Sequence, residues 1–179
     1  AVLDYASLYP SSIIENNLSQ DKYLSNDNPY LQKCRDDKTF DEYIQMIEYD
    51  DYQYIKQGKG DTITKIKTGE IIKCYFLKGH RDDKGEIVDS GLGIIPTVLQ
   101  KVLKARKDTR KLIKTEPDEF KRKVLDGLQL AYKITANSLY GQVGAPTSQI
   151  FMRELAASTT AVGRNLIMSA KKFAEDKYN

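Results

Sequence analysis

The stretch that decides the fold lies in the second half of the chain and reads Lys133-Ile134-Thr135-Ala136-Asn137-Ser138-Leu139-Tyr140-Gly141. It closes a proline-free segment, residues 119–140, that carries apolar side chains at helical spacing. This spacing predicts a helix. We expect Gly141 and Gly144 to end that helix, because glycine favours helix C-termini.

A second helix is predicted immediately before the first. Pro96 suits the first turn of a helix, and apolar residues follow it at helical spacing to about Lys114. Pro117 then interrupts the pattern, and Asp118 or Thr115 can cap the next helix. Because the connection is so short, the two helices are predicted to form an antiparallel hairpin.

The two helices sort their side chains by face. On the later helix, a rotation of about 100° per residue groups one stripe that we expect to face the core: Val124, Leu128, Ala131 and Thr135. The same rotation puts Lys133, Asn137 and Tyr140 on the opposite side. Arg106 and Arg110 are one turn apart on the earlier helix, so both can reach one polyanion. Arginine forks and a lysine charge suit a triphosphate, although for the two arginines taken alone ordinary surface charge is the favoured interpretation.

The first half of the chain has weaker patterns. Residues 1–5 are predicted to form a short strand that ends in a turn of small and polar residues, Ala6, Ser7, Pro10, Ser11 and Ser12. Residues 26–54 are expected to form loops and short strands. Residues 61–77 are rich in β-formers and predict a hairpin with its turn near Thr68 and Gly69, for which an insertion is one interpretation.

Four further segments complete this prediction. A helix is expected to begin within residues 13–18, and residues 79–93, with four glycines, are predicted to form a loop. After Pro146, residues 149–152 look strand-like, and a last helix is predicted from about residue 155 to residue 178.

The composition is that of a globular protein and excludes several function classes. Of the 179 residues, 40% are hydrophobic and 30% are charged. Cys34, Cys74 and the single histidine, His80, are too few for a disulfide scaffold, a histidine- or thiolate-rich zinc site or a catalytic triad. Apolar runs are too short to cross a bilayer, and no leader marks secretion. Cysteine usage points to the inside of a cell.

Positive charge gathers in the predicted hairpin. The net charge is +3, but residues 91–135 hold 11 Lys and Arg against 5 Asp and Glu, while the remainder holds 17 against 20. A solvated helix face is the simpler interpretation, and a phosphate-binding surface is the alternative. The chain also begins at Ala1 in a strand-like run and stops at Asn179 in a helical one, as expected of a piece of a longer reading frame.

Two motifs together carry a resemblance to a known family. The N-terminal run Asp4-Tyr5-Ala6-Ser7-Leu8-Tyr9-Pro10-Ser11 resembles the first catalytic motif of family B DNA polymerases. Residues 133–141 resemble the second, in which a lysine and three further residues precede Asn-Ser-x-Tyr-Gly. Both occur in the family's order with a basic helix between them, and residues 93–106 look like the family's first fingers helix. The amino acids in these segments are most similar to those of polymerases from large DNA viruses of eukaryotes.

The resemblance implies an α+β fold, with part of a polymerase palm and a fingers hairpin. The palm would be an antiparallel sheet with helices, made by residues 1–90, which include a variable insertion, and by residues 145–179. Residues 91–144 would be the antiparallel helical hairpin of the fingers.

The resemblance also implies a site. Polymerisation is a phosphoryl transfer in which two magnesium ions stabilise the attacking and leaving oxygens. Asp4 would bridge both metals, and the Tyr5 carbonyl would complete one shell. Backbone N–H groups from Ser7 to Tyr9 would face the triphosphate, and the Tyr9 ring would exclude a ribose 2′-hydroxyl. Four further residues match family positions that hold the incoming nucleotide, namely Arg106, Arg110, Lys133 and Asn137, and Lys133 would also be catalytic. Tyr140 and Gly141 match positions that contact the nascent base pair.

The third family motif, Tyr-Gly-Asp-Thr-Asp-Ser, does not occur in these residues. We therefore expect residues 1–179 alone not to polymerise.

The expected partners are primer-template DNA and deoxynucleoside triphosphates, with a sliding clamp as a further candidate for the full-length protein and no membrane. If the protein is viral, it would work in the host nucleus or at a cytoplasmic replication site. The alternatives are a non-catalytic nucleic-acid-binding helical hairpin and a structural interaction module.

Overall fold

A computed structural model describes residues 5, 7–56, 63–79 and 91–178. The molecule is α+β, as expected, with a three-stranded antiparallel sheet in the order β1-β3-β2. The sheet strands are β1 (Tyr23–Leu24), β2 (Ile44–Lys56) and β3 (Ile63–Leu77). The helices are α1 (Leu8–Glu15), the 3-10 helix η1 (Gln20–Lys22), α2 (Pro29–Asp36), α3 (Phe40–Tyr43), α4 (Ile94–Thr115), α5 (Glu119–Gly144) and α6 (Arg153–Tyr178).

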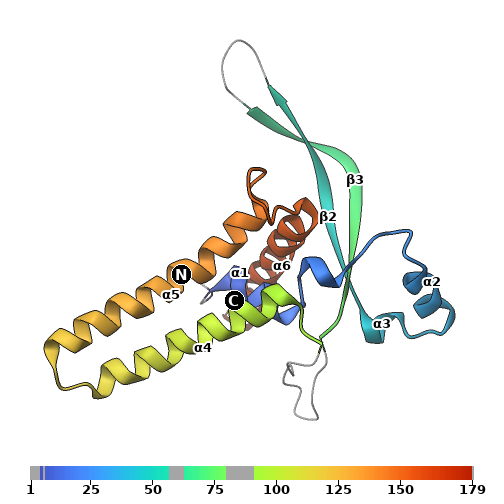
Figure 1. Ribbon diagram of the computed structural model, residues 1–179. Coiled ribbons are helices and arrows are strands. Elements are labelled where there is room, and N and C mark those ends of the chain that lie inside the picture. The colour runs from blue at the N-terminus through green and yellow to red at the C-terminus, as the bar shows by residue number, and fades with distance from the viewer. Residues whose placement is uncertain (1–4, 6, 57–62, 80–90, 179) are drawn as a thin grey trace.

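Figure 1 shows how these elements are arranged. The long helices α4 and α5 run antiparallel and project to one side, while the curved β2–β3 ribbon extends from the other. Between them lie α1 and α6, and α1 contacts α4, α5 and α6. The region around α1 therefore joins the helical hairpin to the sheet.

The predicted helical hairpin is confirmed. Pro96 lies in the first turn of α4, and the side chain of Asp118 accepts a hydrogen bond of 3.0 Å from the Lys121 N–H at the start of α5. Of the two glycines predicted to end α5, Gly144 is its last residue, whereas the helix continues through Gly141. A Cβ atom at position 141 would have nothing within 4 Å, so the surrounding structure leaves room for a side chain there.

The predicted core stripe of α5 is wrong by about a quarter turn. Val124 and Leu128 are 56% and 41% exposed, and Ala131 and Thr135 are exposed as well. The inward face is instead made by side chains that repeat at helical spacing, namely Leu125, Gln129, Tyr132, Ala136, Leu139 and Val143. Both stripes have helical periodicity, and the position of α4 decided which of them is covered.

The predicted hairpin within residues 61–77 is also wrong. Residues 63–77 form the single strand β3, which pairs along its length with β2, in the region expected to be loops and short strands. Asp50 pairs with Ile71 but Tyr52 pairs with Lys67, so Gly69 lies in a bulge rather than a turn. Its φ of +89° suits glycine.

Three smaller expectations also need correction. The segment expected to be a turn at Pro10–Ser12 lies inside α1, whose start precedes the expected residues 13–18. Residues 149–152 form turns and irregular chain rather than a strand. The predicted strand at residues 1–5, apart from Tyr5, and residues 80–90 of the predicted loop, which include His80, lie outside the described residues. The last helix is confirmed as α6.

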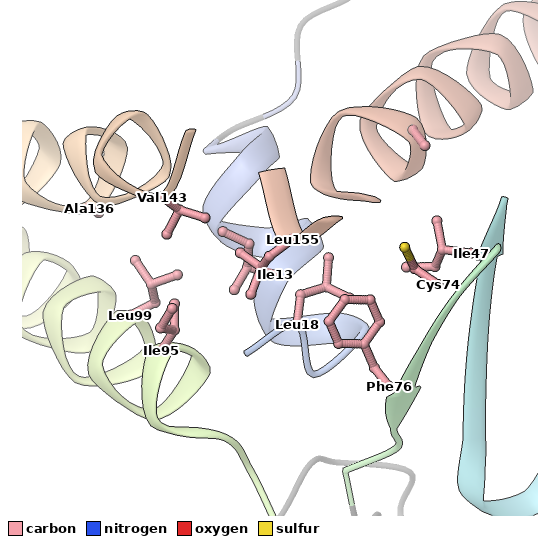
Figure 2. Close-up of a cluster of buried hydrophobic side chains, with 11 residues drawn as sticks. Ile13, Leu18, Ile47, Cys74, Phe76, Ile95, Leu99, Ala136, Val143 and Leu155 are labelled. Atoms are coloured by element: carbon pink, nitrogen blue, oxygen red, sulfur yellow. The ribbon is translucent and has the colours of Figure 1, made fainter. Parts of the chain in front are cut away.

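The main core joins the sheet, α1 and the bases of the long helices (Figure 2). Ile13 and Leu18 lie at its centre with Phe76 of β3, all fully buried. Leu99 of α4, Val143 of α5 and Leu155 of α6 complete the cluster. A smaller cluster packs α2 against the sheet through Leu31, Cys34, Ile44 and Tyr75. No described helix is long and apolar enough to cross a membrane.

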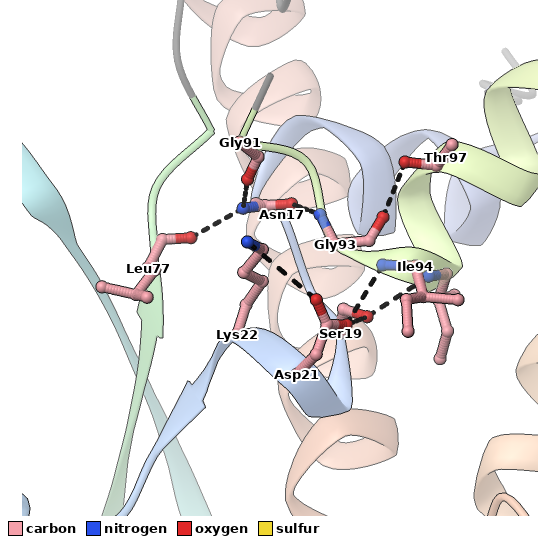
Figure 3. A network of polar contacts seen from close by, with 10 residues as sticks. Asn17, Ser19, Asp21, Lys22, Leu77, Gly91, Gly93, Ile94 and Thr97 are labelled. Carbon is pink, nitrogen blue, oxygen red and sulfur yellow. Dashed lines mark hydrogen bonds and ion pairs between the residues drawn. The ribbon is translucent and has the colours of Figure 1, made fainter. Parts of the chain in front are cut away.

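The start of α4 is closed by side chains from the segment that follows α1 (Figure 3). The amide oxygen of buried Asn17 accepts the Gly93 N–H at 2.8 Å, and its nitrogen donates to the carbonyl oxygens of Leu77 and Gly91. The next two N–H groups donate to Asp21 and Ser19: Ile94 N to Asp21 Oδ1 at 3.1 Å, and Ile95 N to Ser19 Oγ at 3.2 Å. These bonds satisfy N–H groups that a helix start cannot pair internally.

The contact between the start of α4 and the segment that follows α1, here called the joint, also explains why position 93 is a glycine. A Cβ atom at position 93 would lie 2.4 Å from Ser19 Cβ, which is far inside van der Waals contact. Asn17 itself has a φ of +50°, a left-handed conformation that asparagine tolerates better than most residues. The joint therefore depends on a glycine on one side and an asparagine on the other.

Asp21 makes this joint sensitive to pH. Partial burial by itself raises the pKa of the carboxyl, but hydrogen bonds from Ser19 and from the Ile94 N–H outweigh burial, so the pKa is lowered. A lowered folded-state pKa stabilises the fold above the unfolded-state value, and that stabilisation is lost as pH falls through the folded-state pKa.

We predict that Asn17→Ala opens the start of α4. Leaving the buried Gly93 N–H unpaired should lower the opening free energy of residues 91–97 by about 1–3 kcal/mol. Hydrogen exchange followed by mass spectrometry measures this quantity. Asn16→Ala is the matched control, because the Asn16 side chain donates to the Ser12 carbonyl oxygen within the same segment. Equal effects of the two substitutions would contradict the central role of Asn17.

We predict a pH-dependent effect of Asp21→Asn. The substitution keeps an acceptor but removes the charge near the α4 N-terminus, and should cost about 0.5 kcal/mol because the side chain is partly exposed. The difference in unfolding free energy from the unsubstituted protein should be present at pH 7 and shrink below about pH 4. A difference that persists unchanged at pH 3 would rule out the carboxylate charge as its source.

Candidate active site

A pair of stacked tyrosines joins the two sequence motifs. Tyr9 lies in the first turn of α1 and Tyr140 in the last two turns of α5. Their ring centroids are 4.3 Å apart, and the ring planes make an angle of 25°. Tyr9 remains 36% exposed, so part of its ring is open to a ligand. The fold thus brings together residues that the resemblance assigns to the sugar and to the base pair.

Tyr140 is also fixed at its hydroxyl. The Tyr140 hydroxyl lies 2.8 Å from the Thr160 Oγ1 of α6, within hydrogen-bonding distance. Residues of three helices therefore meet at one point, and the contribution from α6 was not foreseen from the sequence. An isolated glycine in a helical pattern, such as Gly163, is a signal that α6 packs closely against a neighbour.

Backbone N–H groups are presented at the start of α1. Ser7 has φ 56° and ψ 49°, a left-handed conformation that is uncommon for a residue other than glycine. No side-chain cap bond is made by Ser7, and Pro10 carries no N–H, so the N–H groups of Leu8 and Tyr9 have no helical acceptor. A left-handed residue before a helix start is the geometry of an anion-binding nest.

The residues expected to hold metal are described only in part. Asp4 lies outside the described residues. Tyr5 is 39% exposed, and its hydroxyl donates to the Leu166 carbonyl oxygen at 3.2 Å. Within the described ranges there is no group of three or more His, Cys, Asp or Glu residues able to hold a metal ion.

The cations of the hairpin lie at different levels. Arg106 of α4 donates from Nε to Gln129 Oε1 of α5 at 3.3 Å. Arg106 and Arg110 line a groove of ≈ 330 Å³ between the helices, with Ile113, Lys114, Asp126 and Gln129. At about 1.5 Å of rise per residue, Arg106, level with Gln129, is about 16 Å along the hairpin from Tyr140.

Lys133 and Asn137 bridge part of that interval. Both are exposed on α5, one turn apart, between Gln129 and Tyr140. Their side chains share the face that lies toward Tyr140, as helical spacing of three and four residues requires. The predicted cations thus form a line along the hairpin, and the structure does not gather Arg106 and Arg110 around the tyrosine pair. Gly141 is exposed beside that pair.

The cysteines do not form a reactive centre. Cys34 and Cys74 are both buried and free. Burial raises the pKa of the Cys74 thiol, and burial together with Cys74 also raises the pKa of the Tyr49 phenol. A thiol with a raised pKa is a poor nucleophile, so we assign Cys74 a packing role.

Comparisons with known proteins agree with the two motifs. The family model for DNA polymerase family B matches residues 1–179. A DNA polymerase of Pyramimonas orientalis virus is 39% identical, covering 99% of this chain and 17% of the viral protein. One of Phaeocystis pouchetii virus is 38% identical, covering 100% and 18%. The DNA polymerase delta catalytic subunit of Oryza sativa subsp. japonica is 34% identical, covering 99% and 13%.

A solved structure has the same fold. The family B DNA polymerase from the hyperthermophilic archaeon Pyrobaculum calidifontis matches with a TM-score of 0.60 at 22% identity, covering 97% of this chain and 17% of that one. At this identity the likeness concerns the fold. The chain spans less than a fifth of the length of these relatives.

Proposed function

This chain belongs to DNA polymerase family B, and from that membership we propose that it forms part of the active centre of a DNA-directed DNA polymerase. The complete protein would add deoxynucleoside triphosphates to a primer 3′ end on a DNA template, in replication of a viral genome inside the host cell. The observation that carries this proposal is the Tyr9–Tyr140 stack, in which the two motifs meet.

The proposed domain division follows the arrangement in Figure 1. Residues 91–144, which contain α4 and α5, would be the fingers, because they project from the remainder as one antiparallel hairpin. Residues 1–90 and 145–179 would belong to the palm, since the sheet, α1 and α6 pack around a common core.

The chain's own residues would divide the work of binding a nucleotide. N–H groups at the start of α1 and the cations Arg106, Arg110 and Lys133 would hold the triphosphate, with Asn137 beside them. The exposed part of the Tyr9 ring would pack on the deoxyribose and leave no room for a 2′-hydroxyl. Tyr140 and Gly141 would line the nascent base pair on its minor-groove side.

The spacing of the cations suggests that the hairpin moves. Arg106 and Arg110 lie far along α4 from the tyrosine pair, so a triphosphate held at the start of α1 would meet them after the hairpin has swung toward α1. Such closure would couple recognition of the correct nucleotide to assembly of the site.

Magnesium fits the donors that this chain would supply. Asp4 would offer a carboxylate oxygen, and Tyr5 a carbonyl oxygen. Both are hard donors of the kind that magnesium prefers. Two bound ions would stabilise the attacking and leaving oxygens of the phosphoryl transfer. A further carboxylate from outside these 179 residues would complete the set, since the third family motif is absent here.

Primer-template DNA is the proposed macromolecular partner. Next to Tyr140, a cleft of ≈ 260 Å³ between the β2–β3 ribbon and α6 is lined by three cationic side chains, Lys65, Arg153 and Arg164, and by one carboxylate, Asp50. Arg153 is also ion-paired with Asp51 at 2.7 Å. Tyr49 and Tyr52 line the same cleft. Positive charge beside aromatic rings is suited to phosphates and bases. A sliding clamp would bind elsewhere in the full-length protein.

We predict that the full-length protein extends a DNA primer with deoxynucleotides and magnesium, and that Asp4→Asn abolishes extension. Residues 1–179 alone should be inactive. Extension by residues 1–179 that Asp4→Ala abolishes would contradict the need for a further carboxylate. If the full-length protein instead binds DNA with steep salt dependence and ignores nucleotide, the alternative of a non-catalytic nucleic-acid-binding hairpin is favoured.

We predict different effects of two neighbouring cations on nucleotide binding. In the full-length protein, Arg106→Ala should weaken deoxynucleoside triphosphate affinity by about 10-fold or more, because it removes a charge-assisted contact. Lys107→Ala removes the same charge from an exposed neighbouring position and should change affinity by about 2-fold or less. Equal losses would show that only the overall charge of α4 matters.

A further inference from the structure

The first turn of α1 comes unusually close to α6 at Gly163. This residue is buried, and a Cβ atom there would lie 3.3 Å from Tyr9 Cε1 and 3.4 Å from Leu8 Cδ2. Carbon atoms are in optimal contact at about 3.5–4.0 Å. The side chain of Tyr9 therefore rests directly on the backbone of α6, and any larger residue at position 163 would displace it.

The Tyr9 ring also stacks on Tyr140, whose hydroxyl contacts α6. Thr160 Oγ1 donates to the Ala156 carbonyl oxygen at 2.9 Å. A threonine hydroxyl has one hydrogen to donate, so in the 2.8 Å contact the Tyr140 hydroxyl donates and Thr160 Oγ1 accepts. The direction of both bonds is thereby fixed, and the ring of Tyr140 is held at its far end.

Thr160 and Gly163 act from the same face of α6. They are three residues apart, so they are neighbours on the helix surface. Both line a cavity of ≈ 190 Å³ with Leu8, Tyr9, Arg164, Ile167 and Met168. One helix face therefore fixes the Tyr9 ring twice, directly through Gly163 and indirectly through Tyr140.

We propose that Thr160 and Gly163 are positioning residues that fix the Tyr9 ring and so set the discrimination between deoxyribonucleotides and ribonucleotides. This inference rests on the proposed function, in which Tyr9 excludes the 2′-hydroxyl. A gate of this kind works by contact, and its selectivity depends on ring placement to a fraction of an ångström, since an error of about 1 Å at a reacting centre can cost 100-fold in rate.

Substitutions at Thr160 and Gly163 should affect the Tyr9 ring, and therefore nucleotide selection, in different ways. Thr160→Val keeps the branched shape but removes the acceptor for the Tyr140 hydroxyl, so both rings are less constrained and a ribonucleotide is admitted more readily. Gly163→Ala adds a Cβ atom 3.3 Å from Tyr9 Cε1, so the Tyr9 ring must shift from the position that it has in the structure. A less constrained Tyr9 ring lowers sugar selectivity, and a displaced Tyr9 ring impedes deoxynucleotides as well.

The experiment uses the full-length protein and insertion of single nucleotides opposite a template base. The measured quantity is the ratio of kcat/KM for a deoxynucleotide to kcat/KM for the matching ribonucleotide. For Thr160→Val we expect this ratio to fall about 3- to 10-fold, the equivalent of one hydrogen bond, with kcat for the deoxynucleotide within about 2-fold of the unsubstituted protein. Thr160→Ser retains the hydroxyl and should restore the ratio.

For Gly163→Ala we expect KM for the deoxynucleotide to rise about 10-fold while the ratio does not fall. Gly127→Ala is the matched control, because Gly127 is also within a helix and a Cβ atom there meets nothing within 4 Å. Its kinetics should match those of the unsubstituted protein.

A third variant separates the hydrogen bond from general damage to α6. If the bond to Thr160 carries the effect, Tyr140→Phe should lower the ratio as Thr160→Val does, and the double variant should be no worse than either. Fully additive effects would overturn the inference, as would an unchanged ratio in Thr160→Val or an unchanged KM for the deoxynucleotide in Gly163→Ala. Failure of the unsubstituted protein to extend any primer would instead refute the proposed function.

Discussion

The placement of the helical hairpin depends on how the N-terminus of α4 is closed. Gly93 provides no side chain to cap α4, so its first N–H groups are satisfied by Asn17, Ser19 and Asp21 from the segment that follows α1. Asn17 also binds the carbonyl oxygen of Leu77, where β3 ends. One buried amide thus ties three parts of the chain together, and losing it would leave polar groups unpaired at each of them.

Fixing the start of α4 fixes the rest of the site by packing. α4 and α5 form one hairpin, so the base of α5 is brought against α1 and α6, where Leu99, Val143 and Leu155 share the core. Tyr140 then reaches Tyr9. The chemistry proposed for this chain therefore depends on a polar joint at one end of the core and on an aromatic contact at the other.

The role of α6 follows from the same geometry. Its N-terminal half is packed, with Leu155, Ser158 and Thr159 fully buried, and its surface meets the tyrosine pair at Thr160 and Gly163. Such contacts place the aromatic rings more precisely than loops would, because a helix holds its side chains at fixed spacing. A helix outside both sequence motifs would in this way determine how those motifs work.

The sequence by itself determined the features that depend on neighbouring residues or on residue identity alone. Pro96 and Asp118 mark helix starts, Pro117 separates the helices, and the two motifs identify the family. Only the tertiary structure decided which stripe of α5 is buried, that Gly69 forms a bulge rather than a turn, and that Thr160 and Gly163 meet the tyrosines. Caps and helix breakers act within a few residues, whereas burial, strand pairing and close helix contacts depend on partners distant in sequence, which a local pattern does not specify.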